Sequence, residues 1–253
     1  FAGQSCDMQA IQRLSQRYGF RIIEDASHAV GGSYLGQPVG NGRFSDLTVF
    51  SFHPVKIITT AEGGMVMTND AAMAAKLERL RSHGITRDAA LMEAEPEGPW
   101  VYEQVELGLN YRLTDLQAAL GFSQLSQLES SVARRHAIAR RYDSELAALP
   151  LITPHQSPDA HSALHLYPIQ LDRSRSTLTR RQLFDGLRAA GIGVNVHYIP
   201  VHTQPHYRRL GFAPGQCPVA EAYYAQAVSL PMFPTLTDAQ QGEVIAALRR
   251  LLG

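Results

Sequence analysis

Apolar and polar residues alternate along the chain with two periods, one typical of amphipathic helices and the other typical of strands. A helical spacing places Met8, Ile11 and Leu14 on one face, directly after Asp7, a favourable N-cap. The first half of the chain then predicts strands over 21–25, 46–52 and 64–70 and a helix over 71–84. A polar loop, 85–104, follows, and loops of that length are typical of functional or mobile segments.

The second half of the chain continues this alternation. The pattern predicts one helix over 115–149, which Thr114 can cap, and Pro150 and Pro154 mark a boundary after it. Beyond the boundary it predicts strands over 161–171 and 192–199 and helices over 180–191 and 239–253. Helices and strands in this order predict a layered α/β fold that ends in a compact α+β part.

The start of the chain is unusual for such a fold. The sequence begins without methionine and enters a helix almost at once, followed by a strand at 21–25. We therefore expect that an N-terminal part of the protein precedes this chain.

Composition and charge exclude several classes of protein. Among the 253 residues, 23 Lys and Arg balance 23 Asp and Glu, so the chain lacks the charge typical of proteins that bind nucleic acid or anionic membranes. No apolar stretch is long enough to span a bilayer, and no signal peptide opens the sequence. Cys6 and Cys217 lie far apart and form neither a disulfide framework nor a metal motif. These features predict a neutral, soluble protein of the cytoplasm.

One stretch, FSFHPVKIITTAEGG over 50–64, carries candidate chemistry. It places Lys56 on what reads as a tight connection between two apolar strands, where an ordinary surface lysine is not expected. A lysine at the edge of a core is either a structural cation or a nucleophile tuned by desolvation. The lysine alone leaves both interpretations open.

Three further residues fall at strand ends or loops of the same region. Asp25 ends a predicted strand, His28 follows it, and Ser51 lies inside the strand before Lys56. Together they form the set that pyridoxal phosphate needs, namely an amine for its aldehyde, a carboxylate for its pyridine nitrogen and a hydroxyl for its phosphate. Each also has a structural alternative: Asp25 could cap a turn, His28 could lie in the core, and Ser51 could bond its neighbouring backbone.

At this point several ordered motifs resemble one family. EDASHAVGGSYLGQPVG and FSFHPVKIITTAEGGMVMTND, followed by LRSHGITRD, LGLNYRLTDLQAALGFSQL, IGVNVHYIPVHTQP and SLPMFP, are similar to the DegT/DnrJ/StrS-type sugar aminotransferases of pyridoxal-phosphate fold type I. The resemblance runs the whole length of the chain. The proline in HPVK, with RSHGITRD and VNVHYIPVHTQPHY, looks most like the branch of UDP-4-amino-4,6-dideoxy-N-acetyl-β-L-altrosamine transaminases, which serve pseudaminic acid synthesis.

The resemblance implies a role for each candidate residue. Lys56 would be the Schiff-base lysine and the proton shuttle, and Asp25 would pair with the pyridine nitrogen. His28 would lie beside the cofactor ring, and Ser51 would donate to the phosphate. Asn110 would reach the phosphate of the neighbouring subunit's cofactor, which implies a homodimer with shared active sites.

The resemblance also implies a substrate and a reaction. Relatives that dehydrate sugars have histidine at the position of Lys56, so the lysine implies transamination, with L-glutamate as amino donor and a 4-keto-6-deoxy UDP-sugar as acceptor. His197 and Tyr198 would line the sugar-nucleotide side, although such a pair at a strand end can also be packing. His53 could face the substrate, or it could only pack beside Pro54.

The departure from the family lies at the N-terminus. Relatives carry there a helix start that grips the cofactor phosphate and an aromatic residue that stacks on its ring, and neither is found upstream of Asp25. We therefore expect residues 1–130 to be the later part of a large cofactor-binding domain and 131–253 to be a linking helix and a small C-terminal domain. The alternative is a remnant that dimerises through LNYRLTDLQAALG and binds no cofactor. A metal site from His197, His202 and His206 is not supported, because their spacing is wrong and no carboxylate lies nearby in the sequence.

Overall fold

The computed structural model describes residues 1–253, and the chain forms two compact units. The N-terminal unit comprises Ser5–Gln127, and the C-terminal unit comprises Leu128–Gly253 together with Phe1–Gln4. The first residues pack with the C-terminal unit, where the backbone N–H of Ala163 donates to the carbonyl of Gly3 at 3.0 Å. That the two units are part of a large cofactor-binding domain and a small C-terminal domain stays a prediction.

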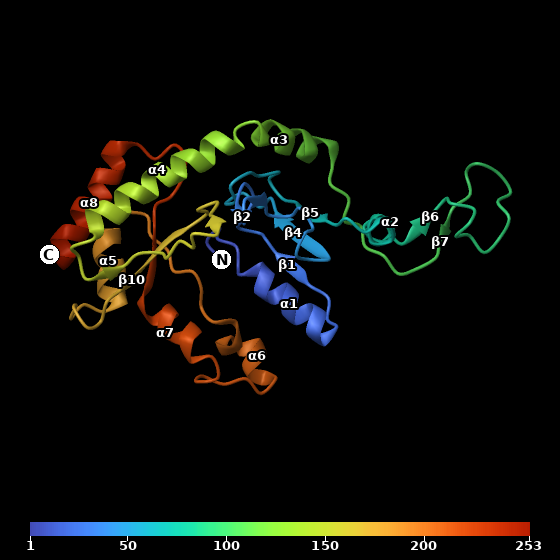
Figure 1. Ribbon diagram of the computed structural model, residues 1–253. Helices are drawn as coiled ribbons and strands as arrows, with labels where there is room; N and C mark the ends of the chain where they lie inside the picture. Colours follow the sequence, from blue (N-terminus) through green and yellow to red (C-terminus); the bar gives the residue numbers. More distant parts are fainter. The chain divides into compact units, whose positions relative to one another are not determined.

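The N-terminal unit is built on a mixed three-stranded sheet. Its elements are α1 (Met8–Tyr18), β1 (Ile23–Asp25), β2 (Ser33–Tyr34), β3 (Gln37–Pro38), β4 (Leu47–Ser51), β5 (Gly64–Met67), α2 (Ala71–Leu80), β6 (Ile85–Thr86), β7 (Glu103–Gln104) and α3 (Asp115–Leu125). β4 lies in the centre of the sheet, parallel to β1 and antiparallel to β5 (Figure 1). The strands predicted around Lys56 are therefore confirmed as neighbours in one sheet, but all four residues of β5 are exposed.

Local chemistry fixes the ends of α1 as the sequence predicts. The Asp7 carboxylate accepts the backbone N–H of Ala10 at 2.9 Å, which satisfies one of the free N–H groups of the first turn. Gly19 ends the helix with a φ of 72°, a left-handed conformation that glycine adopts without steric cost. The chain then turns into β1, which carries Asp25 at its carboxyl end.

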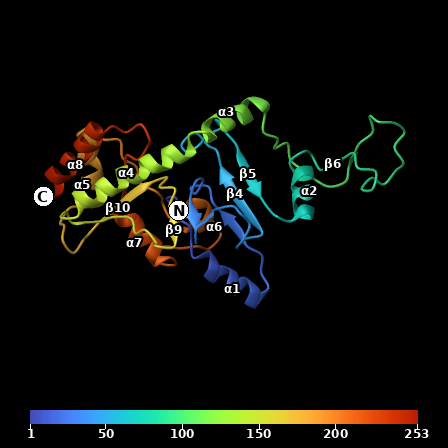
Figure 2. The same ribbon diagram turned by 45° about the horizontal axis from the view of Figure 1, so that its top comes forward.

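The C-terminal unit packs helices against an antiparallel sheet of order β11-β10-β8. Its elements are α4 (Leu128–Leu146), β8 (Leu151–Ile152), β9 (Ala160–His161), β10 (Tyr167–Leu171), α5 (Arg180–Ala189), η1 (Val201–Thr203), α6 (Pro205–Arg209), α7 (Pro218–Gln226), β11 (Ala227–Leu230) and α8 (Asp238–Leu252). Buried residues of α4, α5, α8, β10 and β11 form one apolar core. Figure 2 shows α4, α5, α8 and β10 in this unit. None of the helices is both long and apolar enough to span a membrane.

A buried arginine explains why the strand predicted over 161–171 is broken into β9 and β10. Nη1 of Arg135, which is 4% exposed, donates to the carbonyls of Leu164, His165 and Met232 at 2.9–3.1 Å. Two of these carbonyls belong to the segment between the strands and are therefore not available to a sheet ladder. Burial lowers the pKa of Arg135 to about 10, so the guanidinium stays charged at neutral pH.

Three other predicted elements differ in the structure. The single helix expected over 115–149 is divided into α3 and α4 at residues 126–127, where the two compact units also divide. The loop expected over 85–104 begins and ends in β6 and β7, which pair with each other. The strand expected over 192–199 is reduced to one bridge between Asn195 and Ser229, because the Asn195 side chain accepts the Val196 N–H at 2.8 Å and so removes a donor from the ladder.

Candidate active site

The loop that carries Lys56 connects β4 to β5 and is closed at its base by Phe52. The backbone N–H of Phe52 donates to the carbonyl of Gly63 at 2.8 Å. The carbonyl of Phe52 accepts the backbone N–H of Thr60 and the hydroxyl of Thr59, each at 3.0 Å. The connection is therefore a longer loop fixed by hydrogen bonds, and the expectation of a tight turn was wrong.

The glycine that follows the loop is required by a close approach of Thr60. A Cβ at Gly63 would lie 2.2 Å from Oγ1 of Thr60, a distance that no side chain tolerates. That hydroxyl is not free to move, because it donates to the carbonyl of Glu62 at 2.7 Å. The loop can therefore close onto β5 only with glycine at this position.

Lys56 is half-buried inside this loop, and its backbone N–H donates to the carbonyl of His53 at 2.9 Å. Burial lowers the pKa of its ammonium group, and the negative charge of Asp25 partly opposes this effect. Lys76, the other lysine of the chain, is exposed on α2. The structure thus gives Lys56 an environment that favours the neutral, nucleophilic amine more than the surface does.

Asp25 lies at the end of β1 and is held by Ser27. Its Oδ1 accepts the hydroxyl of Ser27 at 2.6 Å and the backbone N–H of Ser27 at 3.0 Å, whereas Oδ2 receives no hydrogen bond from the chain. The two bonds from Ser27, followed by the positive charges of His28 and Lys56, hold the pKa of Asp25 below its usual value. Ser27 was not among the predicted site residues, although an Asp with Ser two residues later is the spacing of an Asx turn.

The three residues around Asp25 and Lys56 have local contacts as well. His28 is half-buried and close enough to Asp25 to act on its carboxylate. Oγ of Ser51, at the end of β4, accepts the backbone N–H of His53 at 3.4 Å. His53 is exposed; its Nδ1 accepts the N–H of Val55 at 3.4 Å and its Nε2 lies 3.8 Å from Oε1 of Glu62. The structure therefore brings Asp25, His28, Ser51, His53 and Lys56 into one region of the N-terminal unit.

Asn110 lies on a different segment of the same unit, between β7 and α3. The neighbouring backbone is fixed, since Leu109 N–H donates to Leu80 O at 2.7 Å and Tyr111 N–H donates to Arg81 O at 2.8 Å. The Asn110 side chain is exposed and makes no hydrogen bond within the chain. Its amide is thus presented on a rigid backbone without an internal partner.

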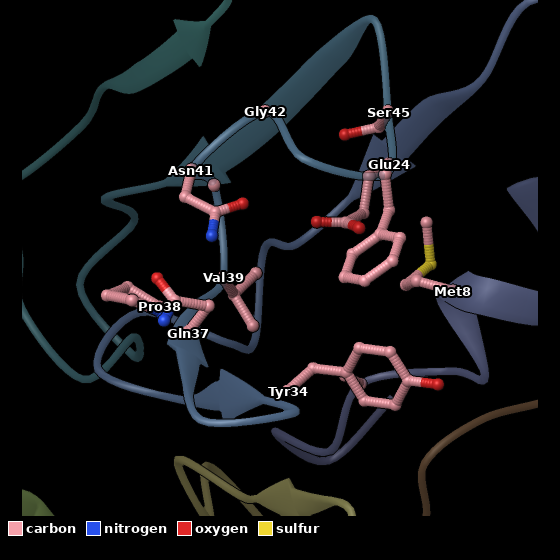
Figure 3. Close-up of a pocket in the computed structure, with 12 residues that line it drawn as sticks. Met8, Glu24, Tyr34, Gln37, Pro38, Val39, Asn41, Gly42 and Ser45 are labelled. Carbon is pink, nitrogen blue, oxygen red and sulfur yellow. The ribbon is translucent and has the colours of Figure 1, made fainter.

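A small pocket lies beside β1 but does not suit a cofactor. Successive side chains of a strand point to opposite faces, so Glu24 points away from the face of Asp25. Figure 3 shows the Glu24 carboxylate inside this pocket, near the loop that carries Val39 and Asn41. Burial raises the pKa of Glu24, although a 3.5 Å hydrogen bond from Thr48 opposes the shift. The cavity volume of about 20 Å³ is enough for a water molecule and for no larger ligand.

His197 and Tyr198 belong to the C-terminal unit, where the structure places them in a hydrogen-bonded and aromatic environment. Nδ1 of His197 lies 2.8 Å from Oγ of Ser229, a residue that the sequence analysis did not single out. The Tyr198 ring meets the rings of His197 and Phe1 edge to face, with centroids 4.7 and 6.2 Å apart. Burial raises the pKa of the Tyr198 hydroxyl, which therefore stays protonated at neutral pH.

The histidines near α6 do not form a metal centre. Nε2 of His202 lies 2.7 Å from Oε1 of Glu221, so the fold brings a carboxylate that is distant in the sequence close to this histidine. No three His, Cys, Asp or Glu side chains are arranged to hold a metal ion. His202 instead pairs with Glu221, and the same Glu221 oxygen accepts the N–H of Gly215 at 2.7 Å.

Comparison with known proteins adds what geometry alone does not give. The family model of the DegT/DnrJ/EryC1/StrS aminotransferases matches residues 1–249. The spore coat polysaccharide biosynthesis protein SpsC of Bacillus subtilis is 39% identical over 255 residues, which include 100% of this chain and 65% of that protein. The chain thus spans slightly less than two thirds of the length of the curated relatives it matches.

Solved structures agree with the family model. PseC of Helicobacter pylori, an aminotransferase involved in the biosynthesis of pseudoaminic acid, has a TM-score of 0.88 and 31% identity over 99% of this chain and 64% of its own. The putative sugar aminotransferase Spr1654 of Streptococcus pneumoniae in its PMP form has a TM-score of 0.88 and 30% identity over 99% of this chain and 67% of its own. The fold is therefore that of the type I pyridoxal-phosphate-dependent transferases, as the sequence predicts.

Proposed function

The chain belongs to the DegT/DnrJ/EryC1/StrS aminotransferase family, whose members depend on pyridoxal phosphate, and from this premise we propose that the full-length protein is a sugar-nucleotide aminotransferase. In this proposal it transfers an amino group from L-glutamate to a 4-keto-6-deoxy UDP-sugar. The observation that carries the proposal is that the half-buried Lys56, in the loop after β4, lies close enough to the Asp25 carboxylate at the end of β1 for their charges to act on each other.

The donor set around Lys56 fits pyridoxal phosphate. When bound, the cofactor supplies an aldehyde carbon and a ring that accepts electrons from the reacting substrate carbon. A lysine whose pKa is lowered by burial loses its proton more readily than a surface lysine, and the neutral amine is the form that bonds to an aldehyde. A carboxylate with a lowered pKa, whose Oδ2 receives no hydrogen bond from the chain, can hold a proton on a ring nitrogen.

Each residue then has a defined task. The amine of Lys56 would hold the cofactor and carry a proton to and from the substrate carbon, and Oδ2 of Asp25 would be the oxygen left to bind the ring nitrogen. The Ser51 hydroxyl, whose oxygen accepts a 3.4 Å contact from the backbone N–H of His53, would donate a hydrogen bond to the phosphate. His28 would lie beside the ring, and its positive charge helps to lower the pKa of Asp25.

The relatives support the sugar-nucleotide part of the proposal. Helicobacter pylori PseC acts in pseudoaminic acid biosynthesis, and Bacillus subtilis SpsC acts in the biosynthesis of spore coat polysaccharide. We assign His53, His197 and Tyr198 to the sugar-nucleotide side, with the pseudaminic acid pathway as the specific setting. A cytoplasmic location is part of the proposal, in keeping with two free cysteines, Cys6 and Cys217.

We further propose a homodimer in which Asn110 acts on the partner's cofactor phosphate. α3 has no buried residue, and it exposes Leu116 and Phe122 at 86% and 80%. Exposed apolar side chains of this size are typical of association surfaces. The same surface favours the alternative candidate, a chain that dimerises through residues 109–121 and binds no cofactor.

One experiment separates the two candidates. The 253-residue chain and the full-length protein are each incubated with pyridoxal phosphate, reduced with borohydride, digested and measured by mass spectrometry. We expect the full-length protein to carry a cofactor-sized adduct on the peptide that contains Lys56. Full-length Lys56→Ala should lose the adduct and several orders of magnitude of activity, while Lys76→Ala should keep both. An unmodified Lys56 in the full-length protein supports the non-catalytic candidate.

The substrate is tested separately. Full-length protein with L-glutamate is offered 4-keto-6-deoxy sugars linked to UDP, TDP or GDP, and amino-sugar formation is followed by mass spectrometry. We expect the highest kcat/KM with the UDP-sugar. A preference for another nucleotide would contradict the assigned substrate and leave the aminotransferase assignment intact.

A further inference from the structure

Ser229 lies where two segments of the C-terminal unit meet. It is the third residue of β11, all four residues of which are buried, and its own exposure is 5%. On one side, β11 pairs with β10 along its whole length. On the other side, the backbone N–H of Ser229 donates to Asn195 O at 2.8 Å, and the N–H of Asn195 donates back at 3.4 Å. Ser229 therefore has a fixed backbone and one fixed side-chain direction.

The Ser229 side chain contacts the imidazole of His197. Its Oγ lies 2.8 Å from Nδ1 of His197, and no other acceptor for the hydroxyl lies within hydrogen-bonding distance in the chain. A buried hydroxyl that leaves its proton without an acceptor loses the solvation it had in water. The Ser229 O–H therefore donates to Nδ1 of His197, and the opposite arrangement, in which Nδ1–H donates to Oγ, is disfavoured.

This hydrogen bond determines the chemistry of the other ring nitrogen. A neutral imidazole carries one proton, so a ring that accepts at Nδ1 carries its proton at Nε2. Rotation about χ2 would break the bond to Ser229, and the Tyr198 ring, with its centroid 4.7 Å away, packs against the imidazole edge to face. The contacts with Ser229 and Tyr198 thus fix both the tautomer and the orientation of the His197 ring.

We propose that Ser229 is a positioning residue that makes Nε2–H of His197 a hydrogen-bond donor to an oxygen of the sugar nucleotide. The inference rests on the proposed function, because that function assigns His197 to the substrate. It goes beyond that assignment by giving the histidine a fixed role as donor and by naming the buried residue that enforces it. Hydroxyl, carbonyl and phosphate oxygens of a sugar nucleotide can all accept such a bond.

The first test needs no substrate. The tautomer of His197 is read from the ¹⁵N chemical shifts of its ring in the 253-residue chain at pH 8, with the signals assigned by loss in His197→Gln. We expect an unprotonated Nδ1 and a protonated Nε2 in the parent, a mixture of tautomers in Ser229→Ala, and the parental pattern in Ser229→Thr. A protonated Nδ1 in the parent, or an unchanged pattern in Ser229→Ala, overturns the inference. His136 and His165, which do not touch Ser229, report in the same spectra whether the fold is retained.

The second test uses the full-length enzyme. Ser229→Ala should raise KM for the sugar nucleotide about tenfold, with little effect on KM for L-glutamate, and Ser229→Thr should restore it. In a His197→Ala background, Ser229→Ala should add no further loss, because its effect acts through the imidazole. Equal losses for both substrates, or additive losses, overturn the positioning role. If the parent enzyme aminates no sugar nucleotide, the proposed function fails, and the tautomer measurement still decides whether Ser229 controls His197.

Discussion

Ser27 donates two hydrogen bonds to Oδ1 of Asp25, one from its hydroxyl at 2.6 Å and one from its backbone N–H at 3.0 Å. Both bonds favour the charged carboxylate and lower its pKa. They also occupy one oxygen and direct the other away from Ser27. Ser27, two positions along the chain, therefore sets both the charge and the orientation of the Asp25 carboxylate in the absence of a ligand.

We predict that Ser27→Ala weakens the stability of the chain above pH 4 more than at pH 3. A carboxyl whose pKa is lower in the folded state contributes stability that is present above its unfolded pKa of about 3.9 and is lost as pH falls through the folded pKa. Removing the hydroxyl raises the folded pKa and reduces this contribution. Urea unfolding at pH 3 and pH 6 measures the difference.

Asp25→Asn is the control for Ser27→Ala, because the pH-dependent part of the Ser27 effect should vanish when the carboxylate is absent. In the full-length enzyme, Asp25→Asn should also lower kcat, since it keeps the shape of the side chain but removes the charge that holds a proton on the ring nitrogen. An Asn variant that turns over like the parent would show that Asp25 is only structural.

Gly84 and Gly19 form a matched pair for testing how closely the segment before Asn110 packs. Their φ angles are 70° and 72°, but a Cβ at Gly84 would lie 1.8 Å from the carbonyl oxygen of Glu106, whereas one at Gly19 would meet nothing within 4 Å. We predict that Gly19→Ala costs about 1 kcal/mol of unfolding free energy and Gly84→Ala on the order of 3–5 kcal/mol. Equal losses in urea unfolding would show that the backbone at Gly84 relaxes easily.

Asn110 can be tested across the proposed subunit interface. Full-length Lys56→Ala and full-length Asn110→Ala are co-expressed with different affinity tags, and hybrid dimers are purified through both tags. If Asn110 acts on the partner's site, one site of each hybrid carries both defects and the other carries neither. Hybrids should then show about half of the parental activity. Inactive hybrids would place Asn110 in the site of its own subunit, and a fully active Asn110→Ala homodimer would place it outside any site.

The stacked rings of His136 and His161 predict a pH-dependent stability of the C-terminal unit. Their centroids lie 4.1 Å apart at 11° between planes, and His136 donates from Nε2 to the Ser162 carbonyl at 2.8 Å. Burial, then His161 and Arg140, lower the pKa of His136, and the bond to Ser162 opposes them. A lowered histidine pKa gives stability that is present above the unfolded pKa of about 6.5 and is lost as pH falls through the folded pKa.

We therefore expect the unfolding free energy to fall between pH 7.5 and pH 5, and to fall less in His161→Phe, which keeps the stacked ring but removes its charge. Urea unfolding at pH 5, 6 and 7.5 measures both. His155→Phe, at an exposed position, serves as the control. An identical pH dependence in His161→Phe and the parent would show that the charge of His161 does not act on His136.

Much of the N-terminal unit could be predicted because its signals are local. Asp7 and Gly19 limit α1, and the strand ends that carry Asp25 and Ser51 follow from apolar runs bounded by polar residues. The β2–β3 hairpin was missed because its turn consists of Leu35 and Gly36, with φ of 47° and 72°. A turn with two positive φ angles is usually signalled by Asn-Gly or Asp-Gly, and leucine gives no such signal.

The parts that could not be predicted depend on residues distant in sequence. The break in the strand predicted over 161–171 is due to Arg135, which takes two of its carbonyls. The hydrogen bond of His197 to Ser229 joins two motifs that lie 32 residues apart, and neither motif indicates the contact. Motif resemblance located the candidate site residues, but the hydrogen bonds that hold them required coordinates.

The closure of the Lys56 loop at Phe52 has a consequence for how a proton can be carried. Phe52 uses both its N–H and its carbonyl to fix the loop ends, and the carbonyl accepts two bonds. The ends of the loop that carries Lys56 are therefore held in place. The four methylene groups of the lysine side chain allow its amine to move. Displacing the amine between two neighbouring atoms then needs only rotations about the single bonds of the side chain. Such a lysine can move its amine by side-chain rotation alone, with no loop rearrangement in each turnover.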